Sequence, residues 1–252
     1  MTLFKDVSTP ALGGIAGLTL YYKIKTIQTI NFSEIMRKII TNTFATLDGV
    51  IQAPGGPEED RAGGFEFGGW SFHYWDDVMG QVMGEGMSKP YDLLLGRKTY
   101  DIFAAHWPFM ENNPTAEQFN ACNKYVATQT LKDATWQNTV LLNGDVVAQV
   151  KALKADEGID LQVHGSCDFI QTLLRHNLID EMNIWIFPLV IGHGKKLFAD
   201  GTMPSNLKLT KHTVSGTGVI ITTYVPDGEI KIGSFALEEP TELELRRREG
   251  IA

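Results

Sequence analysis

Apolar residues along most of this chain occur in short runs that turn residues interrupt, and stretches with helical spacing lie between those runs. Short apolar runs bounded by turn residues are typical of strands, and strands that alternate with helices are typical of an α/β architecture with a largely parallel sheet. The predicted strands are Lys38–Phe44, Tyr91–Leu95, Lys124–Ala127, Thr139–Leu142, Leu161–His164, Glu181–Phe187, Leu207–Val214 and Val219–Val225.

The last two predicted strands are separated by a turn at Ser215 and Gly216 that is too short for a crossover connection. They are therefore expected to pair as an antiparallel hairpin, which makes the sheet mixed at one edge. Apolar residues at three- and four-residue spacing predict amphipathic helices that cover both faces of this sheet. They are Trp75, Val78, Met79, Val82 and Met83, then Val146, Val150 and Leu153, and finally Phe169, Leu173 and Leu174.

The two ends of the chain differ from this pattern. Ala11 to Tyr22 is apolar, but glycines interrupt it and it is too short to cross a membrane. We expect residues 1–35 to be an extension outside the core, with Met36 as the natural start and a signal peptide as the less favoured alternative. Residues 36–235 are expected to form one domain. Residues 236–252 are a charged tail, in which pairs such as Glu242 with Arg246 favour a solvated helix.

Charge and cysteine content exclude several classes of function. The chain has 22 Lys and Arg against 30 Asp and Glu, a net charge of -8, which disfavours a nucleic-acid partner. Cys122 and Cys167 are the only cysteines, and they form no CxxC motif. We therefore expect no disulfide scaffold, and we expect a reducing, cytoplasmic location. The closest metal-like pair, His164 with Cys167, cannot complete a coordination shell, so we expect no metal.

A phosphate-binding turn is predicted where the second strand ends. Gly96 follows a buried strand, and Arg97, Lys98 and Thr99 open a helix. The free N–H groups and the dipole of a helix start attract anions, and two cations reinforce them. The alternative is that both cations are solvated and Thr99 caps the helix.

Two further strands end in similar chemistry. Thr128, Gln129 and Thr130 follow the third strand with hydroxyl and amide groups, and Gly165 with Ser166 repeats the turn before a helix. Ligands of open α/β sheets bind outside the carboxyl ends of the strands, so these turns would converge on one extended ligand such as a dinucleotide. The G-x-G-x-x-G pattern of a Rossmann domain does not follow the first strand.

Candidate substrate-binding residues lie in two other segments. Gly192 and Gly194 permit a tight loop in which Lys195 could receive an anionic substrate, or in which the lysines simply face water. His193 in the same loop is expected to be structural.

The aromatic segment FEFGGWSFHYW, which ends at Trp75, favours a flat substrate. Asp77 is a candidate proton donor beside it, although an acid at a helix start also suits the dipole. Asp48 is a second candidate and could equally cap a turn.

With these motifs the chain resembles the dihydrofolate-reductase-like superfamily, in particular the reductase domain of riboflavin-biosynthesis proteins, from Arg37 to Phe235. The resemblance implies a three-layer fold with NADPH lying across the sheet, and a possible homodimer. It places Gly96 to Thr99 and Thr128 to Thr130 around the adenosine phosphates, Gly165 to Cys167 near the pyrophosphate, and Thr46 to Gly49 near the nicotinamide. The segments that carry it are FATLDGVIQ, LLLGRKTYDIF, KYVATQT, VHGSCDFIQTLL and FPLVIGHGKKLF.

The expected function is hydride transfer from NADPH to a C=N or C=O bond of a small heterocyclic or sugar-linked substrate, as in 5-amino-6-(5-phosphoribosylamino)uracil reductase. The chain departs from those reductases where FAAHWP, Phe103 to Pro108, replaces an acidic stretch, and it has no deaminase domain. Two alternatives are a nucleotide-binding module without turnover and dihydrofolate reduction, for which Asp77 would be the loosely matching carboxylate.

Overall fold

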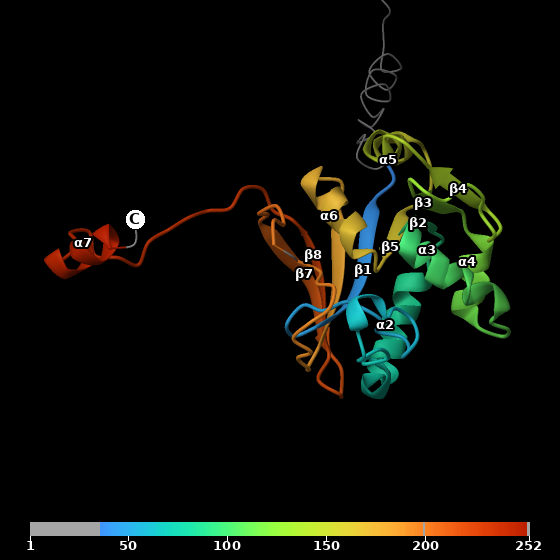
Figure 1. Ribbon diagram of the computed structural model, residues 1–252, viewed down its shortest axis with the longest axis horizontal. Coiled ribbons are helices and arrows are strands. Elements are labelled where there is room, and N and C mark those ends of the chain that lie inside the picture. The colour runs from blue at the N-terminus through green and yellow to red at the C-terminus, as the bar shows by residue number, and fades with distance from the viewer. Residues whose placement is uncertain (1–35, 199, 251–252) are drawn as a thin grey trace, which may run out of the picture.

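The fold is built on one eight-stranded sheet, seen in a computed structural model that describes residues 36–198 and 200–250 (Figure 1). The strands lie in the order β4-β3-β2-β5-β1-β6-β8-β7. Their bounds are β1 (Ile39–Thr46), β2 (Asp92–Gly96), β3 (Lys124–Ala127), β4 (Thr139–Leu142), β5 (Leu161–His164), β6 (Glu181–Phe187), β7 (Leu207–Val214) and β8 (Ile220–Pro226).

The sheet is parallel from β4 to β6 and antiparallel at its last two strands. β1 pairs with β5 on one side and β6 on the other, both in parallel, while β8 pairs antiparallel with β6 and with β7. The predicted mixed, mostly parallel sheet with a C-terminal hairpin is therefore confirmed. Predicted strand bounds differ by one or two residues at β1, β2 and β8, where propensity changes little across the boundary.

Helices cover both faces of the sheet, with the exception of α7 at the C-terminal end. Their bounds are α2 (Asp77–Met87), α3 (Arg97–Ala104), α4 (Pro114–Ala121), α5 (Val146–Ala155), α6 (Cys167–Arg175) and α7 (Glu242–Glu249), with short 3-10 turns η2 (Ala62–Gly64), η3 (Phe72–Tyr74) and η4 (Trp107–Phe109). The sequence pattern missed α4. It was also wrong in the first turn of α2, because Asp76 caps that helix and leaves Trp75 outside it.

Strand alternation divides the core between the two faces. Leu94 and Val163 pack with α5 and α6, whereas Leu93 and Leu95 face the opposite way and pack beneath α3 and α4. Each of these buried side chains stabilises the fold by about 1.5–3 kcal/mol relative to an exposed position. The sheet is thus buried on both sides at its centre, as parallel sheets usually are.

A third apolar cluster lies over β6 and β8. The segment that follows β1 contributes Val50, Phe65 and Trp70, and α2 contributes the fully buried Met79. Phe187 at the end of β6 packs edge-on against Trp70, with ring centroids 5.1 Å apart. This cluster fixes α2 and the aromatic segment over one half of the sheet.

The C-terminal helix α7 lies apart from the sheet at the end of an extended segment (Figure 1). The predicted ion pairs are present, with Glu244 2.9 Å from Arg248 and Glu242 4.0 Å from Arg246. Residues 1–35, including the apolar stretch Ala11 to Tyr22, lie outside the described part of the chain. Within the described part, every helix is too short or too polar to span a bilayer.

Candidate functional site

Two helices begin side by side at the carboxyl edge of the sheet. β2 and β5 are neighbouring parallel strands, and α3 and α6 start directly after them. The backbone N–H of Gly96 donates to Ser166 Oγ at 3.1 Å, and Ser166 Oγ donates to Thr99 Oγ1 at 2.7 Å. Residues about seventy positions apart are therefore joined at one corner.

The backbone at this corner is unusual. Gly165 and Ser166 both have positive φ, 58° and 63°, although only glycine adopts that region without cost. A side chain at Gly96 would lie 3.3 Å from Ser166 Oγ and 3.4 Å from Phe169 Cβ, so glycine allows the two turns to approach. Strained conformations of this kind cluster at ligand-binding sites.

The N-termini of these two helices lack a side-chain cap. In α2, α4, α5 and α7 a side chain accepts from the first-turn N–H groups: Asp76, Asn113, Asp145 and Thr241, respectively. No side chain does so in α3 or α6. Their first-turn N–H groups are left to bind an anion, which the helix dipole also favours.

Two cations accompany the uncapped helix starts. Arg97 forms an exposed ion pair with Asp101, one turn along α3. Lys98 is exposed and forms no ion pair with the described residues. A surface pair such as that of Arg97 contributes about 0–1 kcal/mol, so an anionic ligand can compete with Asp101 for the guanidinium.

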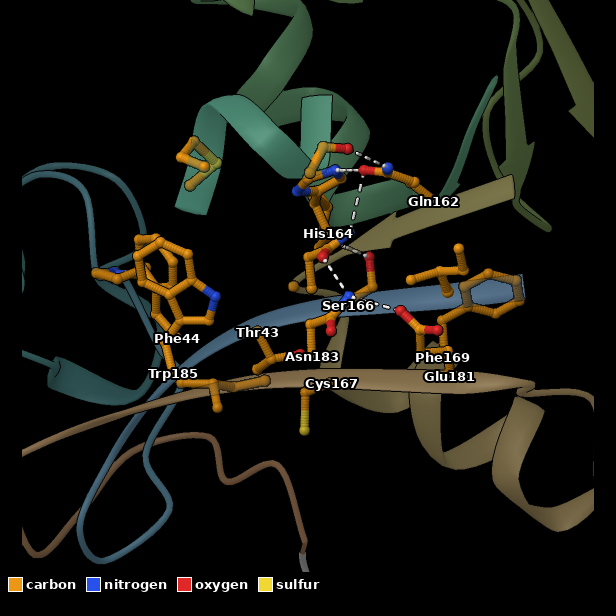
Figure 2. A pocket seen from close by; sticks show the side chains of 18 of the residues that line it. Thr43, Phe44, Gln162, His164, Ser166, Cys167, Phe169, Glu181, Asn183 and Trp185 are labelled. Atoms are coloured by element: carbon orange, nitrogen blue, oxygen red, sulfur yellow. Dashed lines mark hydrogen bonds between the residues drawn. The ribbon is translucent and has the colours of Figure 1, made fainter. Parts of the chain in front are cut away.

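A large pocket runs from this corner across the sheet beneath α2. Its volume is about 1010 Å³, at the upper end of the ~300–1,000 Å³ typical of small-molecule sites. Figure 2 shows its interior, with side chains from β1, β5 and β6 on the floor. The pocket is therefore large enough for an extended ligand and a smaller one beside it.

Aromatic rings form one wall of the pocket. Phe44 on β1 and Trp185 on β6 are cross-strand partners with ring centroids 5.1 Å apart. Trp75 stacks on Trp185 at 6.1 Å with an interplanar angle of 16°, but it does not line the pocket. Flat aromatic walls favour flat ligands.

A row of polar side chains crosses the floor of the pocket on neighbouring strands. Asn42 Nδ2 donates to Gln162 Oε1 at 3.1 Å, and Asn183 Nδ2 donates to Asn42 Oδ1 at 3.1 Å. Thr223 Oγ1 donates to Asn183 Oδ1 at 2.7 Å, and His164 Nε2 lies 3.1 Å from Gln162 Oε1. These partners satisfy polar groups whose burial would otherwise be costly.

Carboxyl groups line the pocket beside the loop that follows β1. The carboxylate of Glu59 accepts from Gly55 N at 2.6 Å and Gly56 N at 3.2 Å, and burial raises its pKa above the ordinary value. Asp60 forms an ion pair with Lys195. The predicted anion receptor Lys195 thus lies in the pocket with its charge already balanced.

The pocket brings together most of the predicted phosphate-binding residues. Those that line it are Gly96, Arg97, Lys98, Thr99, Gly165, Ser166, Cys167 and Lys195. Burial raises the pKa of Cys167, whose thiol donates to the carbonyl of Lys196 at 2.8 Å.

The third predicted turn lies beside the pocket and does not line it. Thr128 is buried, and its hydroxyl accepts from Thr130 N at 3.2 Å and Leu131 N at 2.9 Å. Gln129 donates to the carbonyl of Gly144. The hydroxyl of Thr128 and the side-chain amide of Gln129 therefore form hydrogen bonds with neighbouring backbone groups.

Asp48 and its neighbours connect two loops. Thr46 Oγ1 donates to Asp48 Oδ1 at 2.6 Å and accepts from Val50 N, and Gly49 turns the chain with a φ of 84°. The hydrogen bond from Thr46 and those from Ile191 and Gly192 lower the pKa of Asp48 to about 2. Asp48 is therefore ionised at neutral pH, and it does not line the pocket.

The remaining predicted residues are not among those that line the pocket. Asp77 is exposed in the first turn of α2, and Gly192 is exposed in the loop after β6. Gly194 has a φ of 127°, and a side chain there would meet Phe65 and Val50 at 2.9 Å. None of the three lines the pocket.

The sequence analysis missed the strand residues that form the floor and wall. Phe44, Asn42, Gln162, Asn183 and Trp185 lie inside runs that were assigned to the core. One signal could have identified them: polar residues occur at alternate positions of strands that were predicted to be buried on both faces. Such strands are usually apolar throughout. Within the described residues, no group of three or more His, Cys, Asp or Glu could hold a metal ion.

Comparison with known proteins gives a family match. A family model described as the RibD C-terminal domain matches residues 37–221. The uncharacterized protein YyaP of Bacillus subtilis (strain 168) is 27% identical over 194 residues, which cover 75% of this chain and 94% of that protein.

Solved structures show the same fold. A protein of Shewanella sp. PV-4 assigned to riboflavin biosynthesis matches with a TM-score of 0.54 and 22% identity over 77% of this chain and all of that one. A diaminohydroxyphosphoribosylaminopyrimidine deaminase/5-amino-6-(5-phosphoribosylamino)uracil reductase of Thermotoga maritima matches with a TM-score of 0.51 and 13% identity. That match covers 77% of this chain and 58% of the other.

Proposed function

The chain belongs to the RibD C-terminal domain family, and on that premise we propose that it is a reductase that transfers hydride from NADPH. The acceptor in this proposal is a C=N or C=O bond of a small heterocyclic or sugar-linked molecule. The protein supplies orientation and charge, while the cofactor supplies the hydride.

The pair of uncapped helix starts carries the proposal. α3 and α6 direct unpaired N–H groups to one corner, and the bonds among Gly96, Thr99 and Ser166 hold them together. Two adjacent anion-binding sites match a ligand with more than one phosphate. A dinucleotide that binds here can extend along the pocket toward Phe44 and Trp185.

Preference for NADPH over NADH is assigned in this proposal to Arg97 and Lys98. Both line the pocket at the start of α3, and Lys98 has no ion-pair partner among the described residues. NADPH carries a 2′-phosphate that NADH lacks. A charge-assisted hydrogen bond to a phosphate contributes about 1.5–3 kcal/mol, which corresponds to about tenfold or more in affinity.

The chain differs in sequence from the riboflavin reductases that it resembles at FAAHWP, Phe103 to Pro108. At FAAHWP, Phe103 and Trp107 pack against Phe119, where those enzymes carry acidic residues. Lys195, the cation that could bind a ribosyl phosphate, is paired with Asp60. Reduction of 5-amino-6-(5-phosphoribosylamino)uracil, the reaction named for the Thermotoga maritima relative, is therefore one substrate to test among others.

Cofactor binding is tested by titrating the chain with NADPH and NADH and following tryptophan fluorescence, since Trp185 lines the pocket. Saturable binding of NADPH, about tenfold tighter than NADH, is expected. Arg97→Ala and Lys98→Ala should each remove much of that preference. Lys151→Ala, on the exposed face of α5, removes one positive charge elsewhere and should leave it intact. Absence of saturable NADPH binding would overturn the proposal.

Turnover separates a reductase from a nucleotide-binding module without catalysis. NADPH oxidation is followed at its absorbance maximum in the presence of aminopyrimidines, pterins, dihydrofolate and aldehydes. Oxidation that depends on any one of these compounds is expected. NADPH binding without oxidation by any member of the panel would favour the module.

A further inference from the structure

His164 lies at the end of β5, between the corner formed by Gly96, Thr99 and Ser166 and the aromatic wall formed by Phe44 and Trp185. Its ring lines the pocket and approaches the rings of Tyr91 at 6.4 Å, Phe103 at 6.4 Å and Phe119 at 5.3 Å. Among those neighbours Tyr91 is the titratable group, and burial raises its pKa, so it is uncharged. His164 therefore faces apolar rings and one amide.

The amide of Gln162 has a fixed orientation. Its Nε2 donates to the carbonyl of Gly86 in α2 at 3.3 Å, so Oε1 is the atom that faces His164 and Asn42. The rest of the polar row agrees with this assignment, because Asn42 uses its nitrogen toward Gln162 and its oxygen toward Asn183. Each amide in the row is oriented by the next.

The amide orientation determines the tautomer of His164. An amide oxygen can only accept, so the ring nitrogen 3.1 Å from Gln162 Oε1 must carry the hydrogen. That nitrogen is Nε2. In a neutral ring Nδ1 then has a free lone pair and no hydrogen.

The ring is neutral at physiological pH. Desolvation by burial lowers the pKa of His164 to about 4, because removing a cation from water is unfavourable. Figure 2 shows His164 with Gln162 on one side of its ring and with Phe44 and Trp185 on the other. Asn42 on β1 is the register partner of His164, and Phe44 and Trp185 lie on the same face of the sheet, two residues beyond Asn42 and Asn183 on their strands.

We propose that His164 is a specificity-determining residue whose Nδ1 accepts a hydrogen bond from a flat substrate held beside Phe44 and Trp185. The site thereby selects rings that carry an N–H or O–H donor at that edge. The inference rests on the proposed function in that it takes this pocket as the substrate site. Gln162 is a positioning residue, since it acts by fixing the tautomer.

The tautomer is tested first, without any ligand, by long-range ¹H–¹⁵N NMR of the full chain during a pH titration. His164 is expected as the Nε2–H form and neutral until the pH approaches 4. Gln162→Glu places a carboxylate beside Nε2 and should raise the pKa of His164. Gln137→Glu makes the same change at an exposed position and should leave it unchanged. An Nδ1–H tautomer, or protonation near the ordinary histidine pKa of about 6.5, overturns the proposal.

Ligand selection is tested with lumazine and 1,3-dimethyllumazine, flat bicyclic probes that differ in their ring N–H groups. Binding is measured below the pH at which lumazine loses a proton. Lumazine should bind about tenfold more tightly, the value of one hydrogen bond. His164→Phe keeps an aromatic ring without a lone pair, so it should remove this difference.

NADPH affinity of the same samples distinguishes the two proposals. In two outcomes the unmodified chain binds NADPH saturably and yet binds both probes equally, or binds neither probe. Either result overturns the role of His164 and leaves the proposed NADPH site unaffected. If the unmodified chain does not bind NADPH, the proposed function is overturned. The NMR result on the unmodified chain decides the tautomer even if His164→Phe fails to fold.

Discussion

Asp48 joins two segments that are more than 140 positions apart. Its carboxylate accepts from Thr46 Oγ1, from Ile191 N at 3.2 Å and from Gly192 N at 2.8 Å. The sequence analysis proposed Asp48 as a catalytic residue with a turn cap as the alternative. The observed hydrogen bonds agree with a turn cap. Both carboxylate oxygens of Asp48 accept hydrogen bonds, and these bonds lower its pKa to about 2.

Asp48→Asn is expected to destabilise the fold at neutral pH. The pKa of Asp48 is lower in the folded chain, so its carboxylate stabilises the fold above the unfolded-chain value of 3.8 and loses that effect as the pH falls toward 2. Because the side chain is partly exposed, we expect a loss of about 1 kcal/mol in the free energy of unfolding. Urea denaturation at neutral pH and near pH 2 measures it.

The exposed Asp133 offers a matched control for this prediction, since Asp133→Asn removes the same charge from a loop. Its free energy of unfolding should match that of the unmodified chain at both pH values. If Asp48→Asn lowers the free energy of unfolding equally at neutral pH and near pH 2, the ionised carboxylate of Asp48 is not the cause of the loss.

At the scale of elements, the helices differ in how their ends and interiors are stabilised. α2 has Asp76 as its cap, whose Oδ1 accepts from Met79 N at 2.9 Å, but Gly80, Gly84 and Gly86 occur within its eleven residues. Glycine in a helix interior costs about 0.5–1 kcal/mol relative to alanine. α2 therefore depends on packing through Met79 to remain in place over the pocket.

Gly84→Ala is expected to stabilise the chain by about 0.5–1 kcal/mol. A side chain at Gly84 would meet nothing within 4 Å, and the residue does not line the pocket. Thermal unfolding should show a higher midpoint, and NADPH affinity should not change.

Gly194→Ala provides the opposite case. Its φ of 127° disfavours alanine, and the new Cβ would contact Phe65 and Val50 at 2.9 Å. A loss of about 1–3 kcal/mol is expected. Similar midpoints for Gly84→Ala and Gly194→Ala would show that the local geometry described above does not govern either substitution.

At the scale of the whole molecule, a buried ion pair fixes the amino ends of the strands, opposite the corner formed by Gly96, Thr99 and Ser166. Arg37 lies 2.5 Å from Asp92, and their side chains are 5% and 6% exposed. Arg37 also donates to the carbonyl of Ile159 at 2.6 Å, and Asp92 accepts from Asn123 N at 3.0 Å. The first residue of β2 and the segments before β1, β3 and β5 thus meet at one point.

Arg37→Leu is expected to destabilise the fold by about 3–5 kcal/mol, because it leaves the charge of Asp92 buried without its partner. Urea denaturation gives the free energy of unfolding. The double variant Arg37→Leu with Asp92→Asn should be less destabilised, since it removes the uncompensated charge.

Arg61→Leu is the matched control for that experiment. It breaks the ion pair with Glu58, whose side chains are 65% and 72% exposed, and should cost no more than about 1 kcal/mol. Equal losses at both arginines would refute the claim that burial gives the Arg37 pair its importance.

Local sequence was sufficient to predict the strands, the C-terminal hairpin and the start of α3, because side-chain alternation and the turn at Gly96 are encoded within a few residues. It also predicted Gly165 and Ser166 as a ligand-binding turn, and the structure brings them to the pocket. Whether they bind NADPH stays a prediction.

Only the tertiary structure decided which polar residues meet. Asn42, Gln162 and Asn183 come from strands far apart in sequence, and their register places them in one row beneath α2. Tertiary packing also brings Lys195 into an ion pair with Asp60 and places Asp48 in hydrogen-bond contact with the loop at Gly192. Hydrogen bonds and ion pairs act over a few ångströms, so their partners depend on how distant segments pack, which no local pattern specifies.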